Sequence, residues 1–122
     1  MTQDNTAWPK EIRLNSEKNK LSVGFDNGSS FDYQAEFLRV LSPSAEVQGH
    51  SPDQRVTVPG KSDVLVKAIE PVGNYAVRIV FDDGHDTGLY SWEYLHELGV
   101  SYDIFWQEYL DELQEKGLSR TR

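Results

Sequence analysis

The sequence predicts an α+β protein: a small, mostly antiparallel sheet built from two related β-hairpins and followed by C-terminal helices. Two turn signals, Asp26-Asn27-Gly28 and Asp82-Asp83-Gly84, each follow a segment in which apolar residues alternate. Helical patterns with capping residues occupy the last third of the chain. A length of 122 residues fits one small domain, so these elements should share one core.

The first hairpin can be given a register from the positions of its apolar residues. A strand is predicted over Lys20–Phe25. A two-residue loop would set Val23 opposite Asp32, whereas a three-residue loop sets Val23 opposite Phe31. The three-residue loop keeps the apolar residues on one face, so it is the preferred register, and Gly28 takes its left-handed position.

The rest of the chain divides into strands, a long connection and two ends. Further strands are predicted over Glu11–Leu14, Arg55–Val58, Val64–Ile69 and Tyr75–Phe81. Residues 42–63 are rich in Ser, Pro and Gly, which is long for a loop without structure in a small domain. We expect a loose arm over residues 1–10, the domain over 11–100, and a helix with a frayed tail over 101–122.

Two helices are predicted at the end of the chain. Ser91 is a suitable N-cap for the first helix, and Gly99 suits the position just after its last turn. The second helix is predicted to begin after Ser101 and to run to about Lys116, with Gly117 behind it. Its aromatic and leucine residues share one face, which would serve equally to pack on the core or to form a dimer.

An internal repeat relates the two hairpins. The residues FDNG at 25–28 match FDDG at 81–84, and the segment 33–38 matches 90–95. The copies lie 56 residues apart before the turn and 57 after it, so the second copy gains one residue between His85 and Tyr90. Two copies are too few for a solenoid, and they favour a small domain built from related halves.

Composition excludes several classes of function. The net charge of −8 and the pI near 4.7 disfavour nucleic acid and anionic membranes as partners, because most of the surface repels phosphate. Arg120 and Arg122 beside Lys116 form a basic cluster, which we interpret as part of a frayed tail. The chain has no cysteine, so disulfides and thiolate metal sites are excluded. We expect a cytoplasmic monomer or weak homodimer.

Two short motifs do not support an enzyme. Gly60-Lys61-Ser62 resembles the end of a phosphate loop, but Arg55 occupies the position where that motif requires glycine. The triplet His85-Asp86-Thr87 resembles the His-x-Asp part of a non-haem iron triad, but its third residue is Thr instead of Asp or Glu. With no nucleophile in a recognisable setting, we expect a protein without catalytic activity.

His85 is the residue with the most open interpretation. The three-residue turn places it opposite Phe81 on the apolar face, where its ring must form hydrogen bonds. A bond to a backbone carbonyl or to Asp86 is the structural interpretation. The alternative is a divalent metal site, for zinc or iron, formed by His85, His50, Asp83 and Asp86.

Three segments of the chain resemble a known protein family. They are residues 38–44 (LRVLSPS), 73–77 (GNYAV) and 81–99 (FDDGHDTGLYSWEYLHELG). The chain is similar to the gamma-butyrobetaine hydroxylase-like N-terminal domain over roughly residues 11–100, in the stand-alone bacterial form. In the large carnitine-pathway dioxygenases, this domain precedes the catalytic barrel and is itself non-catalytic. The resemblance therefore implies a non-catalytic domain here.

The resemblance also implies a zinc site that this chain does not reproduce. The family binds zinc through three cysteines and one histidine, and the corresponding positions here are Ser42, Ser44, Val47 and His85. Hydroxyls and a valine do not replace thiolates in structural zinc sites, so we expect that zinc site to be absent. The family's fusion to carriers of iron–sulfur cluster assembly implies a role near metal-cofactor handling.

The leading hypothesis is an accessory or binding domain without catalytic activity. Its partner would be a protein, either an oxygenase or an iron–sulfur assembly carrier. The connection 42–63 and the turn around His85 are the predicted contact surface, to which Tyr90, Trp92 and Arg39 would contribute.

Overall fold

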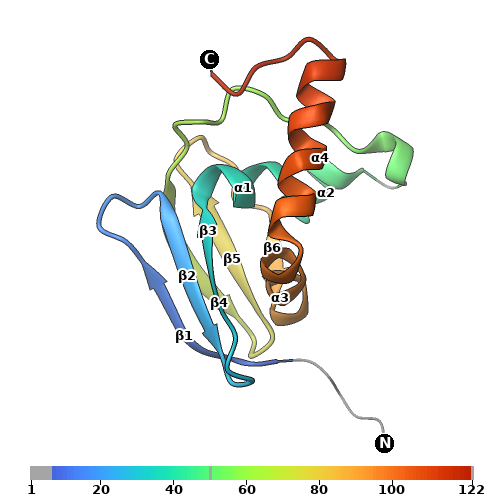
Figure 1. Ribbon diagram of the computed structural model, residues 1–122. Helices are drawn as coiled ribbons and strands as arrows, with labels where there is room; N and C mark the ends of the chain where they lie inside the picture. Colours follow the sequence, from blue (N-terminus) through green and yellow to red (C-terminus); the bar gives the residue numbers. More distant parts are fainter. Residues whose placement is uncertain (1–6, 50, 122) are drawn as a thin grey trace, which may run out of the picture.

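The computed structural model describes residues 7–49 and 51–121, which form two three-stranded antiparallel sheets with α3 and α4 along one side (Figure 1). The first sheet contains β1 (Pro9–Leu14), β2 (Lys20–Phe25) and β3 (Ser30–Gln34). The second contains β4 (Val66–Val72), β5 (Ala76–Phe81) and β6 (Leu89–Ser91). The helices are α1 (Ala35–Val40), α2 (Ala45–Gln48), α3 (Trp92–Val100) and α4 (Tyr102–Glu115), with a 3-10 turn at Pro52–Gln54. The α+β class is confirmed, although the strands form two sheets rather than one.

The first hairpin has the register that its apolar pattern predicts. Val23 lies opposite Phe31, and Leu21 lies opposite Tyr33. Gly28 closes the three-residue turn with a φ of 90°, a conformation that glycine adopts without steric cost. Leu21, Val23 and Tyr33 are fully buried, so the hairpin presents one apolar face to the core.

Two of the other predicted strands differ from the structure. Residues 55–58 form no strand, and the N–H of Val56 instead donates to the carbonyl of Val47 at 2.7 Å. The predicted strand over 64–69 is shifted, because β4 begins at Val66 and continues through Pro71. Proline is tolerated there since β4 is an edge strand, where a missing N–H can face away from the sheet.

The internal repeat is longer than the sequence indicates, because it includes the first strand of each sheet. The pairing of β1 with β2 is interrupted by a bulge between Pro9 and Glu11. The pairing of β4 with β5 has the same irregularity between Val66 and Ala68. Each half of the repeat is therefore a three-stranded sheet followed by a helix, with β1, β2, β3 and α1 matching β4, β5, β6 and α3.

The turns of the two halves match in their hydrogen bonds. The side-chain oxygen of Asn27 accepts the N–H of Ser29 at 3.0 Å. In the second half, Asp83 Oδ1 accepts the N–H of His85 at the same distance. An Asx turn of this kind is a hydrogen bond within the loop itself, so it stabilises each loop locally.

Two tyrosines connect the halves reciprocally. The hydroxyl of Tyr33 donates to the carbonyl of Leu95 in α3 at 2.6 Å. The hydroxyl of Tyr90 donates to the carbonyl of Leu38 in α1 at 2.5 Å. Positions 33 and 38 of the first half correspond to 90 and 95 of the second, so the two bonds are related by a pseudo-twofold arrangement of the halves.

The helix α3 begins where the sequence predicts but ends later. The Oγ of Ser91 accepts the N–H of Tyr94 at 3.0 Å, which confirms the N-cap. Gly99 was expected just after the helix, and this is wrong because α3 continues through Val100. Glycine is required at 99 for a different reason: a Cβ there would lie 2.3 Å from the ring of Phe31.

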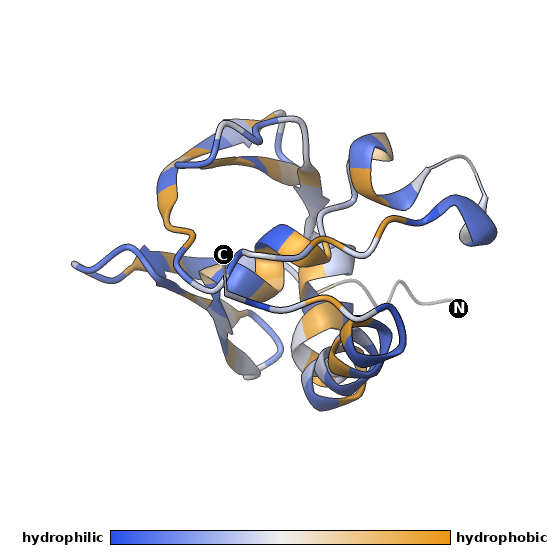
Figure 2. Cartoon of the chain, turned by 90° about the horizontal axis from the view of Figure 1, so that it is seen from above, coloured by the Kyte–Doolittle hydropathy of each residue, from blue (hydrophilic) through white to orange (hydrophobic). Residues whose placement is uncertain are grey.

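The helix α4 packs on the core with one face, which is one of the two roles that the sequence left open for it. Tyr109 and Leu113 are buried, and the outer side of α4 is hydrophilic (Figure 2). Gly117 follows the helix with a φ of 66° and turns the chain. No helix within the described residues is both long and apolar enough to cross a membrane.

The two ends of the chain are more ordered than expected where they are described. Pro9 already belongs to β1, so the predicted arm is limited to earlier positions, of which 1–6 lie outside the described residues. The carbonyls of Ser119 and Arg120 accept the N–H groups of Gly60 and Ser62 at 2.9 and 3.0 Å. Residues 118–121 therefore run beside the connection 42–63 instead of fraying, and residue 122 lies outside the described part.

The reciprocal tyrosine bonds lead to a stability prediction. Tyr33→Phe and Tyr90→Phe should each lower the free energy of unfolding by about 1 kcal/mol, the net contribution of one buried hydrogen bond. Tyr75→Phe is the control, because Tyr75 lies outside β5 and is 58% exposed. Urea denaturation measures all three, and equal stability of the three variants would contradict a role for the two bonds.

Candidate functional site

The turn that ends at His85 packs against the segment that follows α1. His85 Nε2 lies 2.8 Å from Ser42 Oγ, and His85 Nδ1 lies 3.1 Å from a carboxylate oxygen of Glu46. The His85 side chain is only 2% exposed, and Ser42 is fully buried. The imidazole thus joins the turn of the second half to the loop that follows the first half.

The sequence predicts a hydrogen-bonded histidine but not these partners. Asp86, one of the predicted partners of His85, has its carboxylate 3.4 Å from Arg78. A backbone carbonyl, the other predicted partner, is replaced by the hydroxyl of Ser42 and the carboxylate of Glu46. Both ring nitrogens of His85 are therefore occupied by side chains that lie about forty positions earlier in the chain.

Ser42, His85 and Glu46 stand in the order of a nucleophile, a base and an acid that orients the base. Catalysis would also require a hydroxyl that a substrate can reach. Ser42 is 0% exposed, and its Oγ also accepts the N–H of Ser44 at 3.2 Å. The backbone of Gly88 closes the remaining side, since a Cβ on Gly88 would lie 2.5 Å from this oxygen. The cluster can connect two segments, but it gives no access to a substrate.

The positions that correspond to the family's zinc ligands do not fit a zinc ion. Ser42 Oγ is bonded to His85, and Ser44 Oγ lies 2.6 Å from the hydroxyl of Thr87. Val47, at the third position, contributes a buried isopropyl group. Neutral hydroxyls bonded to one another and a hydrocarbon side chain supply none of the thiolates that structural zinc requires.

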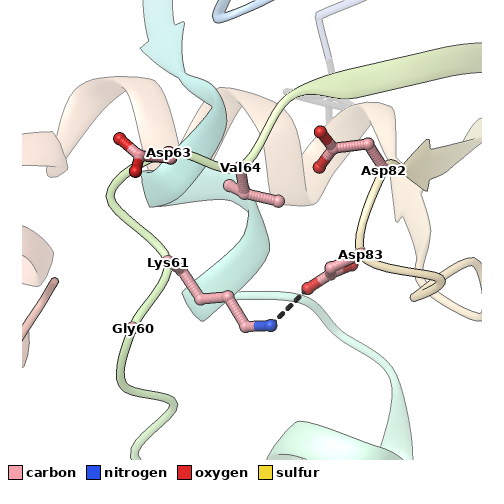
Figure 3. Close-up of a pocket in the computed structure, with 6 residues that line it drawn as sticks. All are labelled: Gly60, Lys61, Asp63, Val64, Asp82 and Asp83. Carbon is pink, nitrogen blue, oxygen red and sulfur yellow. Dashed lines mark ion pairs between the residues drawn. The ribbon is translucent and has the colours of Figure 1, made fainter. Parts of the chain in front are cut away.

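Asp83 accepts hydrogen bonds from three donors next to this cluster. Its carboxylate lies 2.6 Å from Lys61 Nζ (Figure 3). It also lies 2.8 Å from Arg39 Nε and accepts the His85 N–H. Burial alone raises the pKa of Asp83, but the bonds from Lys61, His85 and Arg39 outweigh burial and bring the pKa to about 2. Asp83 is therefore an ionised link between α1, the connection 42–63 and the turn.

A small polar cavity of about 180 Å³ lies beside Asp83, lined by Gly60, Lys61, Asp63, Val64, Asp82 and Asp83 (Figure 3). The charges of Lys61 and Asp83 in its wall are already paired with each other. Arg39 does have an unpaired atom: its NH1 is the buried side-chain nitrogen without a hydrogen-bond partner among the described residues. Arg39 does not line the cavity, so that nitrogen is not directed to a ligand there.

The predicted metal ligands are separated by their contacts. Asp83 is held by Arg39 and Lys61, Asp86 by Arg78, and His85 by Ser42 and Glu46, which leaves no shared open position. Residues 7–49 and 51–121 contain no group of three His, Asp or Glu residues arranged to hold a metal. His50 lies outside the described residues, so the part of the prediction that depends on it stays a prediction.

The predicted contact residues fall in three different environments. The prediction that Tyr90 contributes to an exposed surface is wrong, because Tyr90 is fully buried and its hydroxyl donates to a carbonyl of α1. Trp92 is partly buried, and its Nε1 donates to the carbonyl of Asn74 at 2.9 Å. The Arg39 side chain is 12% exposed and engaged with Asp83. These residues therefore do not form one exposed patch.

The Arg39–Asp83 contact has a counterpart in the other half. Position 39 corresponds to His96, whose Nε2 lies 3.2 Å from Nδ2 of Asn27, and Asn27 corresponds to Asp83. In both places a helix residue of one half contacts the turn of the other half. The ionic version occurs only at the second turn, which marks that turn as the more specialised of the two.

Sequence reasoning missed Ser42, Glu46 and Lys61 as partners of the second turn. Ser42 was considered only as a lost zinc ligand, and Lys61 only as part of a rejected phosphate loop. The repeat contained a usable signal, because it aligns Arg39 with His96 and so indicates that α1 faces the turn of the other half. It contained no signal for Lys61, which lies in the connection between the halves.

The environment of His85 predicts a loss of stability in mild acid. Burial lowers the pKa of His85, the Arg39 charge lowers it further, and Glu46 and Asp83 offset this only in part. A folded-state pKa below the unfolded value of about 6.5 means that the unfolded chain binds the proton first. The stabilising contribution is complete above pH 6.5 and is lost as the pH falls toward the folded-state pKa.

We therefore expect the free energy of unfolding to fall below pH 6.5, by up to about 1.4 kcal/mol per pH unit. His85→Gln should show a flatter dependence between pH 7.5 and 5, measured by urea denaturation. His96→Gln is the matched control for removal of a histidine and should retain the wild-type slope. A His85→Gln slope equal to that of wild type would rule out the buried neutral imidazole as its cause.

Comparison with solved structures finds close relatives of the whole chain. Two NMR solution structures are 46% and 45% identical, with TM-scores of 0.82 and 0.81. The first match covers 98% of this chain and 89% of the other, and the second covers 95% and 91%. A crystal structure of a protein of unknown function from Acidithiobacillus ferrooxidans, described as a DUF971 family member, is 36% identical. That match has a TM-score of 0.64 and covers 80% of this chain and 98% of the other.

The comparison with curated proteins finds no match. The model of the family described as gamma-butyrobetaine hydroxylase-like, N-terminal, matches residues 12–96, which extends from β1 into α3 and includes both halves of the repeat. This match covers well over half of the chain, and the solved relatives share its fold at 36% identity or more. The chain therefore belongs to the gamma-butyrobetaine hydroxylase-like N-terminal domain family.

Proposed function

We propose that this chain is a non-catalytic accessory domain that binds another protein. One observation carries the proposal: in the Ser42–His85–Glu46 cluster the hydroxyl and the imidazole are enclosed, with Ser42 fully buried and His85 2% exposed at its side chain, and the exposed member is Glu46. The residues that most resemble reactive machinery instead hold the loop after α1 to the turn before β6. A domain whose polar clusters are used internally acts through its surface.

The resemblance suggests two classes of protein partner, an oxygenase catalytic domain and a carrier of iron–sulfur cluster assembly. The connection 42–63 is the segment that we assign to contact with that partner. It exposes Val56, which is 48% exposed, beside polar side chains at positions 53 and 54. An exposed aliphatic residue with a polar surround is suited to the centre of a protein interface.

Binding can be measured with purified proteins. The full chain should bind one of the two partner classes in isothermal titration calorimetry, and Val56→Ser should weaken binding about fivefold, equivalent to about 1 kcal/mol. Val100→Ser is the matched control, since Val100 is 63% exposed at the end of α3, away from the connection.

The proposal fails if neither partner class binds, or if Val56→Ser and Val100→Ser weaken binding equally. Hydrolysis of an ester substrate by the wild-type chain that disappears in Ser42→Ala would replace the proposal with an enzymatic function.

The alternative function is metal binding through His50 and His85. The observation that favours it is that His85 Nδ1 and a Glu46 carboxylate oxygen already lie 3.1 Å apart, and Glu46 is four residues from His50. Imidazole and carboxylate are suitable ligands for zinc or ferrous iron.

Titration with zinc, followed by the imidazole NMR signals, tests this alternative. The signals of both His50 and His85 should shift together, His96 should not shift, and His50→Gln should abolish the effect. Unchanged signals for both His50 and His85 would exclude metal binding by this pair.

A further inference from the structure

A buried carboxylate is covered by an arginine from the end of the described chain. Glu36 lies in the first turn of α1, and its side chain is 7% exposed. The Arg120 guanidinium makes two hydrogen bonds to it, Nε at 2.8 Å and NH2 at 2.7 Å. A bidentate fork of this kind is specific for guanidinium, because a lysine ammonium cannot reproduce both bonds in one plane.

The surroundings of Glu36 form a pocket suited to a planar cation. The guanidinium carbon of Arg120 lies 5.2 Å from the centroid of the Trp106 ring, within the range of a cation–π contact. A cavity of about 270 Å³ continues beside it, lined by Glu36, Tyr102 and Trp106 among others. The wall is rigid, because the Tyr102 ring stacks on Phe37 with centroids 3.8 Å apart.

The connection 42–63 adds main-chain donors at the edge of the pocket. The N–H groups of Gly60 and Ser62 bind the carbonyls of Ser119 and Arg120 at 2.9 and 3.0 Å. The pocket therefore holds the Arg120 side chain together with the main chain that carries it, which bends at this residue. Main-chain bonds of this type are independent of side-chain identity, so the arginine provides the selectivity.

The covering segment is more exposed than the pocket it covers. Residues 117–121 are all exposed, and the Arg120 side chain is 47% exposed against 7% for Glu36. Release of the segment would break the bidentate bond to Glu36, the contact with Trp106 and the main-chain bonds to the connection 42–63. Glu36 would then face the cavity without a counter-charge, which favours its occupation by another cation.

The two halves of the repeat differ at this site. The residue that corresponds to Glu36 in the second half is Glu93, which is exposed. In the first half, residues of α4 pack against α1 and Arg120 covers the Glu36 carboxylate. The pocket therefore belongs to the first half alone.

We infer that the pocket of Glu36, Tyr102 and Trp106 is a recognition site for an arginine-containing peptide segment, occupied in the isolated chain by its own Arg120. The inference rests on the proposed function, because it specifies the chemistry of the protein partner. Arg120 acts as an internal competitor, so a partner's arginine binds when residues 118–121 leave the pocket. A tethered competitor of this kind has an effective concentration of the order of millimolar.

The test uses the full chain and the acetylated, amidated tetrapeptide Leu-Ser-Arg-Thr, which reproduces residues 118–121. Arg120→Ala should bind this peptide at least tenfold more tightly than wild type does, measured by the shift of the Trp106 indole N–H signal. The same peptide with citrulline in place of arginine should bind at least tenfold more weakly, because it keeps the shape and loses the charge. Arg13→Ala is the matched control: it removes an arginine paired with a glutamate on the exposed strand β1, and it should bind as wild type does.

Arg120→Lys is the second variant, and it keeps a charge near Glu36 without the bidentate contact. Its affinity for the arginine peptide should lie between those of wild type and Arg120→Ala. Equal binding of the arginine and citrulline peptides, or no gain in either Arg120 variant, would overturn the inference. If the peptide does not bind while a partner protein still binds the wild-type chain, this inference alone is wrong and the accessory function stands.

Discussion

The hydrogen bonds from Tyr33 and Tyr90 to main-chain carbonyls of the opposite half fix how the two halves are placed around an apolar core to which both contribute. Each half is a three-stranded sheet and one helix, which is too small to bury a core of its own. Because each tyrosine ends on the other half's helix, α1 and α3 are placed by the partner half as well as by their own strand. The Arg39–Asp83 ion pair and the burial of Glu36 then depend on a position of α1 that the second half has set.

The local parts of the fold could be predicted from the sequence, and the parts that depend on distant contacts could not. The register of Val23 with Phe31 follows from a nearby turn and an apolar alternation, both of which lie within a dozen residues. The separation into two sheets depends on whether β1 and β4 pair with each other, and no local pattern decides that. The correspondence of β1 and β4 is not visible in the sequence, because the two strands (PKEIRL and VKAIEPV) share a bulge and a register but few residues.

The sequence pointed to His85, Asp83 and Arg39 but not to the other residues that surround them. His85 stood out because a polar ring on an apolar face needs partners, which is a local argument. Its actual partners, Ser42 and Glu46, come from a loop about forty positions away, and only the resemblance pointed to position 42. Tyr90 was assigned to the contact surface although aromatic residues at strand-to-helix spacing more often belong to the core. Its burial is decided by the carbonyl of Leu38, which the sequence does not reveal.

The two close glycines show how the halves have come to differ in shape. Phe31 of the first half touches Gly99, and the corresponding contact of the second half brings Gly88 against Ser42. In the first contact, the large side chain is Phe31 and the glycine is at the end of the helix. In the second contact, the glycine takes the position of Phe31, and the small hydroxyl of Ser42 takes the position of Gly99. Two copies of the first half would force a phenyl ring into a serine, and two copies of the second would leave glycine facing glycine across a void. The two halves have therefore become complementary in shape, and neither half can substitute for the other.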